Sequence, residues 1–281
     1  MLVASATLWG KFMDNNKIIG IIGGGNMGGG IAKGIVSSNL VSPQNVIVSD
    51  ISANRRKELE ETLKVRTTAG NVELCSEADI IFLVVKPYLL AQVVEEIKDY
   101  VNEDALVISV AAGQSIAKVE GMFGRSIHLI RIMPNLGAVV GESMTGYTAN
   151  TRVTEEELAE AAEIFNSFGK CEQIKESLMD VITAVSGSAP AYICTFIDAM
   201  ADAAVLNGMP RAQAYNICSQ VVLGTAKYLS ETGMTPSELK DMVCTPGGAS
   251  IEAVTVMEKE GLRGAVHAGV TACTLKSKNL G

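Results

Sequence analysis

A glycine-rich stretch near the amino terminus constrains the fold of this chain more than any other feature. Residues 18–22 form an apolar, β-branched run that is typical of a strand buried on both faces, and glycines follow it directly. Gly23, Gly25 and Gly28 have the spacing G-x-G-x-x-G, and a helix is predicted from residue 26 to residue 38. The chain is therefore expected to begin with a strand, a tight turn and a helix.

Each of the three glycines has its own predicted role in binding a dinucleotide. Gly23 permits the tight turn, Gly25 lets a pyrophosphate approach the backbone, and Gly28 lets the helix pack closely on the strand. The phosphates would bind unpaired N–H groups at the start of the helix, at Asn26 and Met27, where the helix dipole favours negative charge. Glycine clusters also end strands for purely structural reasons, so the prediction depends on context: a strand before, a helix after, and a second strand beyond.

That second strand, predicted over 45–49, ends at Asp50 and bears on the choice of cofactor. A carboxylate at this point accepts hydrogen bonds from a free ribose 2′-hydroxyl and repels a 2′-phosphate, which favours NADH. Arg55 and Arg56 favour NADPH if the loop folds back, or they lie solvated in the first turn of a helix over 53–64. The residues leave NADPH and NADH both open as cofactors.

Composition excludes several classes of protein. A chain of 281 residues with 48% hydrophobic residues can bury the cores of two ordinary domains. A net charge of −8 argues against a nucleic-acid partner, whose phosphates need clustered Lys and Arg. Six scattered cysteines are typical of free thiols in a reducing cytoplasm, and two histidines are too few for a metal site. The longer apolar stretches are broken by glycine, proline or charge, so no membrane partner is predicted.

Alternation of strands and helices predicts the fold class of the first half. Apolar strands are expected over 79–85, 105–110 and 127–133, with helices between them, which indicates a mostly parallel sheet with right-handed crossovers. This is an α/β, Rossmann-type doubly wound sheet. Ligands of such sheets lie at the carboxyl ends of the strands, so residues 86–87, 111–113 and 134–135 are expected along one cleft.

The pattern becomes helical in the second half. Thr154 and Glu157 form a capping box for a helix to about residue 168, and a short strand over 171–174 completes the first domain. Ser177 resembles another helix cap, three residues before Asp180. We expect a flexible extension over 1–16, a dinucleotide-binding domain over 17–176 and an all-α domain over 177–281. Helices over 188–207 and 211–229 are too apolar for a single small domain to hide, which predicts a homodimer.

One stretch of the helical half is not simple helix. Thr245-Pro246-Gly247-Gly248 forces a turn whose backbone N–H groups can face a ligand, with Ser250 at the head of the next helix. Ser250 is either only the N-cap of a helix over 251–260 or also one of several donors suited to a carboxylate. A second interruption precedes the long helix, at residues 187–190.

At this point the motifs resemble a family. Their order and approximate spacing, from about residue 17 to residue 280, are similar to those of pyrroline-5-carboxylate reductases. The glycine fingerprint and Val-Lys-Pro are shared with other dehydrogenases, whereas the combination with G-S-x-P-A-Y and P-G-G is far more specific. The motifs are Gly23–Gly28, Val85–Pro87, Ala111–Gly113, Met133–Asn135, Gly187–Tyr192 and Pro246–Ile251.

The resemblance implies the last step of proline synthesis, in which NAD(P)H transfers a hydride to the C=N carbon of Δ1-pyrroline-5-carboxylate. It implies that the helical domain forms dimers, which in the family are often assembled into decamers. It also implies that Glu176 and the Ser250 hydroxyl lie near the ring nitrogen as catalytic groups. The implied cofactor contacts, besides the glycine loop and Asp50, are Asn71, Val85, Lys86, Pro87, Ala112 and Gly113. The implied substrate contacts are Glu176, Gly247, Gly248, Ala249 and Ser250.

Three departures from the family pattern affect the site. Ser250 stands in place of the usual threonine, Ala189 replaces a glycine of G-S-G-P, and Asp50 stands where many relatives have a small polar residue. Three other kinds of protein with such a first domain remain as alternatives. A β-hydroxyacid dehydrogenase would need a lysine on the first long helix, and residues 188–207 contain none. A related imine reductase and a dinucleotide-binding protein without catalysis are the other two.

Overall fold

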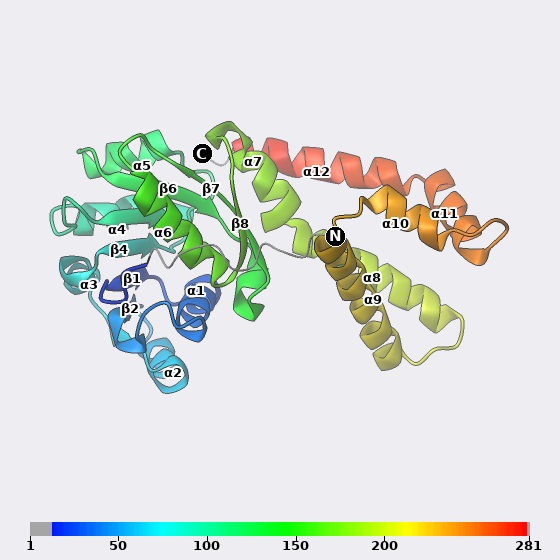
Figure 1. Ribbon diagram of the computed structural model, residues 1–281, viewed down its shortest axis with the longest axis horizontal. Helices are drawn as coiled ribbons and strands as arrows, with labels where there is room; N and C mark the ends of the chain where they lie inside the picture. The colour runs from blue at the N-terminus through cyan, green and yellow to red at the C-terminus, as the bar shows by residue number, and fades with distance from the viewer. Residues whose placement is uncertain (1–12, 280–281) are drawn as a thin grey trace. The chain divides into compact units, whose positions relative to one another are not determined.

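The computed structural model describes residues 13–279, and the chain divides into two compact units. The first unit comprises Met1–Gly187 together with Thr274–Gly281, and the second comprises Ser188–Cys273. The first unit contains an eight-stranded sheet with helices on both faces, and the second consists of helices joined by turns (Figure 1). The predicted fold class, a Rossmann-type sheet followed by an all-α region, is confirmed.

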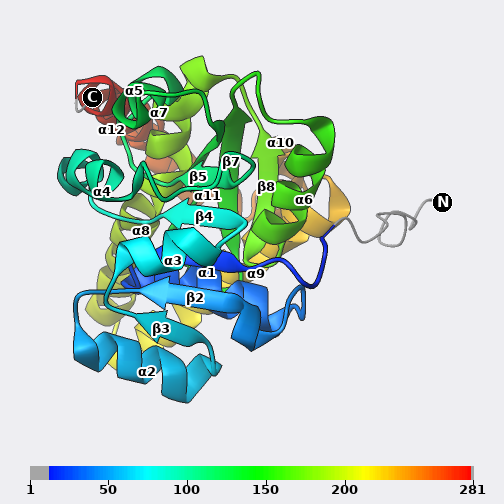
Figure 2. The same ribbon diagram turned by 90° about the vertical axis from the view of Figure 1, so that its left-hand side faces the viewer.

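The sheet has the strand order β3-β2-β1-β4-β5-β6-β7-β8. All neighbours are parallel except β6 and β7, and the order reverses between β1 and β4. Figure 2 shows β3 with helix α2 at one edge of the sheet and β8 at the other. Ligands of open α/β sheets bind where the order reverses, outside the carboxyl ends of the strands. The strands are β1 (Ile19–Ile22), β2 (Val46–Ser49), β3 (Arg66–Thr68), β4 (Ile80–Leu83), β5 (Leu106–Ser109), β6 (His128–Met133), β7 (Ser143–Ala149) and β8 (Gly169–Gln173).

Helices occupy most of the remaining described chain. Those of the first unit are α1 (Asn26–Ser37), α2 (Ala53–Leu63), α3 (Asn71–Glu77), α4 (Leu90–Ile97), α5 (Ile116–Phe123), α6 (Glu155–Asn166) and α7 (Met179–Ile182), with 3-10 turns η1 (Pro43–Asn45), η2 (Pro87–Leu89), η3 (Leu136–Val140) and η4 (Glu176–Leu178). A π-helical turn, η5 (Thr183–Gly187), follows α7. The later helices are α8 (Ala189–Leu206), α9 (Arg211–Thr232), α10 (Pro236–Val243), α11 (Ala249–Lys259) and α12 (Leu262–Lys278).

Two buried apolar clusters cover the two faces of the sheet. Alternate residues of β5 divide between them, with Ile108 in one cluster and Val107 in the other, as the two-residue period of a strand requires. Helices α1 and α6 contribute to the first cluster, and α3, α4 and α5 to the second. Phe165 of α6 anchors the first cluster, with its ring centroid 5.4 Å from that of Tyr147. The sheet is thus fixed on both sides, which holds its carboxyl edge in place.

Most of the predicted elements are present, with shorter ends. The Thr154–Glu157 capping box is confirmed at the start of α6, where both of its reciprocal hydrogen bonds form. The predicted Ser177 cap is wrong, because Lys175 is the N-cap of η4 and makes no side-chain cap. The interruption predicted at 187–190 is instead a π-helical turn that leads into α8. Strands β3 and β7 and helix α3 were not predicted, whereas α5 is the helix expected between the strands at 105–110 and 127–133.

The helical run Glu176–Leu206 is long and apolar enough to cross a membrane by length and composition alone. The run has 31 residues, and an 18-residue window within it has a mean hydropathy of 1.4. Only 6% of that window is buried inside the protein. The sequence reading that glycine and proline break this stretch is wrong. Gly187 closes the π-helical turn, and Pro190 stands in the first turn of α8, where a missing N–H costs nothing.

The predicted amino-terminal extension covers residues 1–16. Residues 1–12 of it lie outside the described part of the chain. Met13 is buried at 4% exposure, and its N–H donates to Glu163 Oε2 at 3.0 Å. Lys17 Nζ forms an ion pair with Glu160 Oε2 at 2.6 Å. From Met13 onward the chain is therefore held against α6.

Candidate active site

The glycine turn after β1 has the geometry that its spacing predicts. Gly23 has a φ of +101°, and a Cβ there would lie 2.3 Å from the carbonyl oxygen of Val84. A Cβ on Gly28 would lie 1.9 Å from the carbonyl oxygen of Gly23, so helix and turn approach too closely for any side chain. A Cβ on Gly25 would meet no atom within 4 Å. Gly23 and Gly28 are thus required by the fold, whereas Gly25 faces open space.

The first turn of α1 offers free backbone donors. Its N-cap is Gly25, which provides no side-chain cap, and no acidic residue occupies the first turn. The initial N–H groups of a helix have no partner within it, so those of Asn26 and Met27 need an acceptor from elsewhere. Gly25 and Asn26 are exposed. An anion such as a pyrophosphate fits this helix end, because donors, dipole and open space coincide there.

Asp50 lies at the end of β2, where a cofactor ribose is expected, and its carboxylate contacts the glycine turn. Asp50 Oδ2 accepts from the N–H of Gly24 at 2.9 Å, and Oδ1 accepts from the N–H of Ser52 at 2.8 Å. The two arginines fold back over the same region. Arg55 Nε donates to the carbonyl oxygen of Gly24 at 2.5 Å, and Arg56 Nη1 to that of Asp50 at 2.7 Å. The alternative of solvated arginines is therefore wrong: both bind backbone carbonyl oxygens, and Arg55 also forms an ion pair with Glu58 Oε2 at 2.8 Å.

Residues predicted to contact the cofactor follow β3 and β4. Asn71 begins α3, and its Oδ1 accepts from the buried hydroxyl of Ser49 at 2.7 Å, while Nδ2 donates to Glu96 at 3.0 Å. This fixes the orientation of the Asn71 amide beside the end of β2. Val85 is half-buried, and Lys86 is the exposed N-cap of η2, which begins at Pro87. These residues follow strands that share a parallel register, so they lie along the same edge of the sheet.

The loop after β5 connects the predicted nicotinamide contacts to Glu176. Ala112 and Gly113 lie in this loop, which ends where Ser115 caps α5 by accepting from the N–H of Lys118. Glu176 Oε1 accepts from the N–H of Ile116, the first residue of α5, at 2.7 Å. The structure thus brings Glu176 to the end of the loop that contains Ala112 and Gly113.

One polar residue at the carboxyl edge was missed by sequence reasoning, and another, at the predicted 134–135 turn, has a more specific role than a turn former. Arg131 of β6 is only 6% exposed, and its Nη1 lies 3.2 Å from Glu176 Oε1. A charge inside an otherwise apolar strand is a sequence signal for a buried ion pair, and the heptapeptide at 127–133 contained it. Asn135 is the second, because it caps η3 and donates through Nδ2 to Ser186 Oγ at 3.0 Å.

Four of the predicted substrate residues, Gly247–Ser250, lie in one turn and the helix start that follows it in the second unit, whereas Glu176 belongs to the first unit. Between α10 and α11, the N–H of Gly248 donates to the carbonyl oxygen of Thr245 at 3.0 Å, which closes the turn around Gly247. Gly248 is the N-cap of α11, so Ala249 and Ser250 are its first two residues. The prediction of Ser250 as an N-cap is wrong, although the residue does lie in the first turn of the helix. Gly248 provides no side-chain cap, which leaves the first N–H groups of α11 available.

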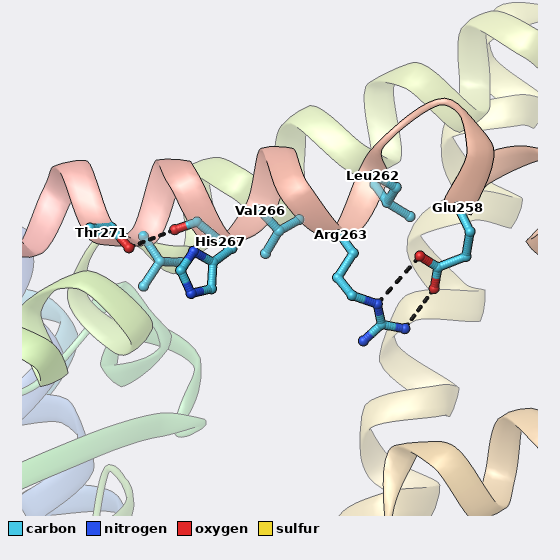
Figure 3. A pocket seen from close by; sticks show the side chains of 7 residues that line it. Glu258, Leu262, Arg263, Val266, His267 and Thr271 are labelled. Atoms are coloured by element: carbon cyan, nitrogen blue, oxygen red, sulfur yellow. Dashed lines mark hydrogen bonds and ion pairs between the residues drawn. The ribbon is translucent and has the colours of Figure 1, made fainter.

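An open apolar cavity of about 530 Å³ lies on α11 and α12, and no predicted site residue lines it. Figure 3 shows Val266, His267 and Thr271 along α12, with the Arg263 guanidinium paired to the Glu258 carboxylate. The shortest distance in this pair is 2.6 Å. The cavity is therefore a feature of the exposed helical surface and not of the nucleotide-binding edge.

The six cysteines are free thiols, as predicted. Burial raises the pKa of the Cys75 thiol to about 12, and the nearby Glu96 carboxylate adds to the effect. Burial likewise raises the pKa of Cys171 to about 11. A nucleophilic cysteine needs a lowered pKa, so neither of these thiols is suited to that role.

Comparison with known proteins identifies the family. A family model described as "Pyrroline-5-carboxylate reductase dimerisation" matches residues 176–280, and one described as "NADP oxidoreductase coenzyme F420-dependent" matches residues 18–113. The chain is 45% identical over 264 residues to the pyrroline-5-carboxylate reductase of Escherichia coli, covering 94% of this chain and 98% of that protein. It is 40% identical over 269 residues to the pyrroline-5-carboxylate reductase of Methanosarcina acetivorans, covering 96% and 99%.

Solved structures agree with this assignment. The crystal structure of Plasmodium falciparum pyrroline carboxylate reductase with NADP bound has a TM-score of 0.85 and 32% identity, covering 95% of this chain and 99% of that one. The enzyme from Coxiella burnetii has a TM-score of 0.89 at 32% identity, with the same coverage. Both halves of the chain, the nucleotide-binding sheet and the helical region, are matched. The chain belongs to the pyrroline-5-carboxylate reductase family.

Proposed function

We propose that this protein reduces Δ1-pyrroline-5-carboxylate to L-proline with NADPH or NADH, the last step of proline biosynthesis. The observation that carries the proposal is the uncapped start of α1 above a turn that only glycine fits, in a chain that matches this family over nearly its whole length. When bound, the reduced nicotinamide supplies a hydride to the C=N carbon of the substrate. The rest of the chemistry consists of holding the two reactants and placing one proton on the ring nitrogen.

In this proposal the first unit holds the cofactor along the carboxyl edge of its sheet. The backbone from Gly23 to Gly28 binds the pyrophosphate through N–H groups at the start of α1. Asp50 and Asn71 lie toward the adenosine ribose. The residues that line the remaining cofactor are Val85, Lys86, Pro87, Ala112 and Gly113. Arg55 and Arg56 donate to the backbone carbonyl oxygens of Gly24 and Asp50, where they can reach a 2′-phosphate, which supports use of NADPH as well as NADH.

The turn before α11 is proposed to hold the substrate carboxylate. Free N–H groups at a helix start favour a carboxylate, and those around Gly247, Gly248, Ala249 and Ser250 are available. We assign the Ser250 hydroxyl and the Glu176 carboxylate to the ring nitrogen. An iminium accepts a hydride more readily than a neutral imine, so groups that favour the protonated nitrogen lower the barrier.

We further propose a cytoplasmic homodimer with no membrane or nucleic-acid partner. The helical region matches a dimerisation model and exposes large apolar side chains that include Phe196, Val221 and Val266, at 38%, 52% and 56%. A monomer rarely exposes so much contiguous apolar surface in water. A second copy covering these helices accounts for the apolar run Glu176–Leu206 without a membrane. Assembly of such dimers into decamers is the expectation that the family resemblance adds.

A steady-state assay tests the proposal. Purified protein is supplied with the cyclic imine and either NADPH or NADH, and nucleotide oxidation is followed at equal concentrations of the two cofactors. Turnover of pyrroline-5-carboxylate with formation of proline is expected with both. Tight cofactor binding with no turnover would instead indicate a dinucleotide-binding protein, and preferential oxidation of a β-hydroxyacid would indicate the related dehydrogenases.

A further inference from the structure

A buried guanidinium at the carboxyl edge has more hydrogen-bonding capacity than the fold uses. Arg131 lies in β6 between the core residues Ile130 and Ile132, and it is 6% exposed. Its Nη1 lies 3.2 Å from Glu176 Oε1, but its Nε is buried without a hydrogen-bond partner in the described chain. A buried ion pair with an unsatisfied donor is a poor way to stabilise a core, because apolar residues of similar volume do it at least as well.

The neighbouring strand repeats this feature. Ser109 of β5 pairs in register with Arg131, so the two side chains lie on the same face of the sheet. Ser109 is fully buried, and its hydroxyl also has no hydrogen-bond partner among the described residues. Two adjacent unsatisfied polar groups at the end of β5 and β6 call for an explanation other than packing.

The Arg131 contact leads directly to the loop of the proposed nicotinamide contacts. Glu176 Oε1 is shared between Arg131 and the N–H of Ile116, which begins α5. The loop that contains Ala112 and Gly113 ends at this helix start. Only 36% of the Glu176 side chain is exposed, so the carboxylate is held between the guanidinium and the loop. A displaced carboxylate would release the end of the loop.

We propose that Arg131 is a positioning residue for the reaction: it holds the Glu176 carboxylate against the start of α5 and so fixes the loop 111–115. The inference rests on the proposed function for the role of Ala112 and Gly113, and it adds a residue to which neither the sequence motifs nor the comparisons assign a role. Arg131 acts through Glu176 and the loop, and it does not itself have to touch a reactant.

Arg131→Met and Arg131→Lys test the proposal in the full-length protein. Methionine keeps an unbranched apolar stem and removes the charge, and lysine keeps the charge. We expect kcat to fall about 10- to 100-fold in Arg131→Met with KM for both substrates nearly unchanged, because small displacements of reacting groups cost rates of this order. Arg131→Lys should recover part of the loss. If Arg131 served stability alone, its substitution would not lower kcat in protein that remains folded.

A second readout does not depend on turnover. Hydrogen exchange of residues 111–116 in the cofactor-free protein should become more than about tenfold faster in Arg131→Met, because the N–H of Ile116 loses its fixed acceptor. The matched control is Arg66→Met, which removes a strand arginine paired with Glu77 at 2.7 Å but 39% exposed. This control should leave both kcat and the exchange of 111–116 as in the wild type.

The outcomes separate this inference from the proposed function. Wild-type protein that does not reduce the imine overturns the proposed function, and the exchange measurement still decides the role of Arg131. Active wild type with unchanged kcat and unchanged exchange in Arg131→Met overturns the positioning role alone. If Arg131→Met does not fold, Glu176→Gln replaces it in the exchange measurement alone, because Glu176 is itself assigned to the reaction, and unchanged exchange of residues 111–116 in that variant overturns the proposal.

Discussion

Replacing Gly25 by alanine separates what the glycine turn does for folding from what it does for the cofactor. Gly25 has φ −60° and ψ −164°, a conformation open to any residue, and its Cβ would meet no atom within 4 Å. The free energy of unfolding should therefore change by less than about 1 kcal/mol, the usual size of an N-cap effect. The added methyl group would project into the space where the pyrophosphate is proposed to bind.

The loss of cofactor affinity can be estimated from the contacts at stake. A hydrogen bond to a charged group contributes about 1.5–3 kcal/mol, so displacing the pyrophosphate from one N–H donor should raise Kd by about 10- to 150-fold. Gly28→Ala is the matched comparison. Its Cβ would lie 1.9 Å from the carbonyl oxygen of Gly23, so the turn must move, and we expect a destabilisation of about 1–3 kcal/mol.

Nicotinamide fluorescence titration gives Kd for NADPH, and urea unfolding gives the stability of the same samples. The expected pattern is normal stability with weak binding for Gly25→Ala, and lowered stability for Gly28→Ala. Wild-type affinity in Gly25→Ala would refute the placement of the pyrophosphate at the start of α1. A strongly destabilised Gly25→Ala would show that the open space at this residue does not exist in solution.

Three further predictions concern catalysis, the core and pH. Ser250→Ala should lower kcat while leaving Kd for the cofactor unchanged, and equal activity would remove Ser250 from the mechanism. Phe165→Ala should lose about 3–5 kcal/mol of unfolding free energy in urea titrations, because this fully buried ring packs against three other aromatic rings of its cluster. Burial raises the pKa of Glu157, but hydrogen bonds from the Thr154 N–H and the His128 ring outweigh burial and lower the pKa below its ordinary value of 4.5. The wild type should therefore be more stable than Glu157→Gln by its full margin above pH 4.5, and this margin should disappear as the pH falls through the lowered pKa of Glu157. Urea unfolding midpoints of the two proteins that differ equally at pH 3 and pH 7 would contradict this prediction.

The sequence predicted the central strands well, because their residues are buried on both faces. Strands β1, β4 and β5 are continuous apolar runs, and such runs bounded by glycine or charge have few alternatives in a parallel sheet. The glycine turn was equally predictable, since the close contact at Gly28 excludes any side chain. The local sequence pattern was therefore enough to predict this turn, because the backbone geometry there permits only one type of residue.

Other elements depend on partners that are distant in sequence. Strand β3 is a short run, Arg66–Thr68, with no fully buried residue, so its pairing with β2 gives it no apolar signature. The contact between Arg131 and Glu176 joins residues 45 positions apart. The sequence predicted that Asp50 follows β2 at the end where the ribose is expected. Its hydrogen bond with the N–H of Gly24 was not predictable, because that bond depends on the exact path of the glycine turn.

The division of the chain has a consequence for its synthesis. Because residues 274–281 belong with the amino-terminal unit, the helical unit is an insertion that interrupts it. Ser277 is 3% exposed, and its hydroxyl donates to Asp180 Oδ1 at 2.7 Å. A nascent chain whose Ser277 has not yet left the ribosome cannot make this contact, so the nucleotide-binding unit reaches its final form only after the whole helical unit has been made. Chains ended early by a premature stop codon would lack it, and they are expected to be preferred substrates of cellular proteases.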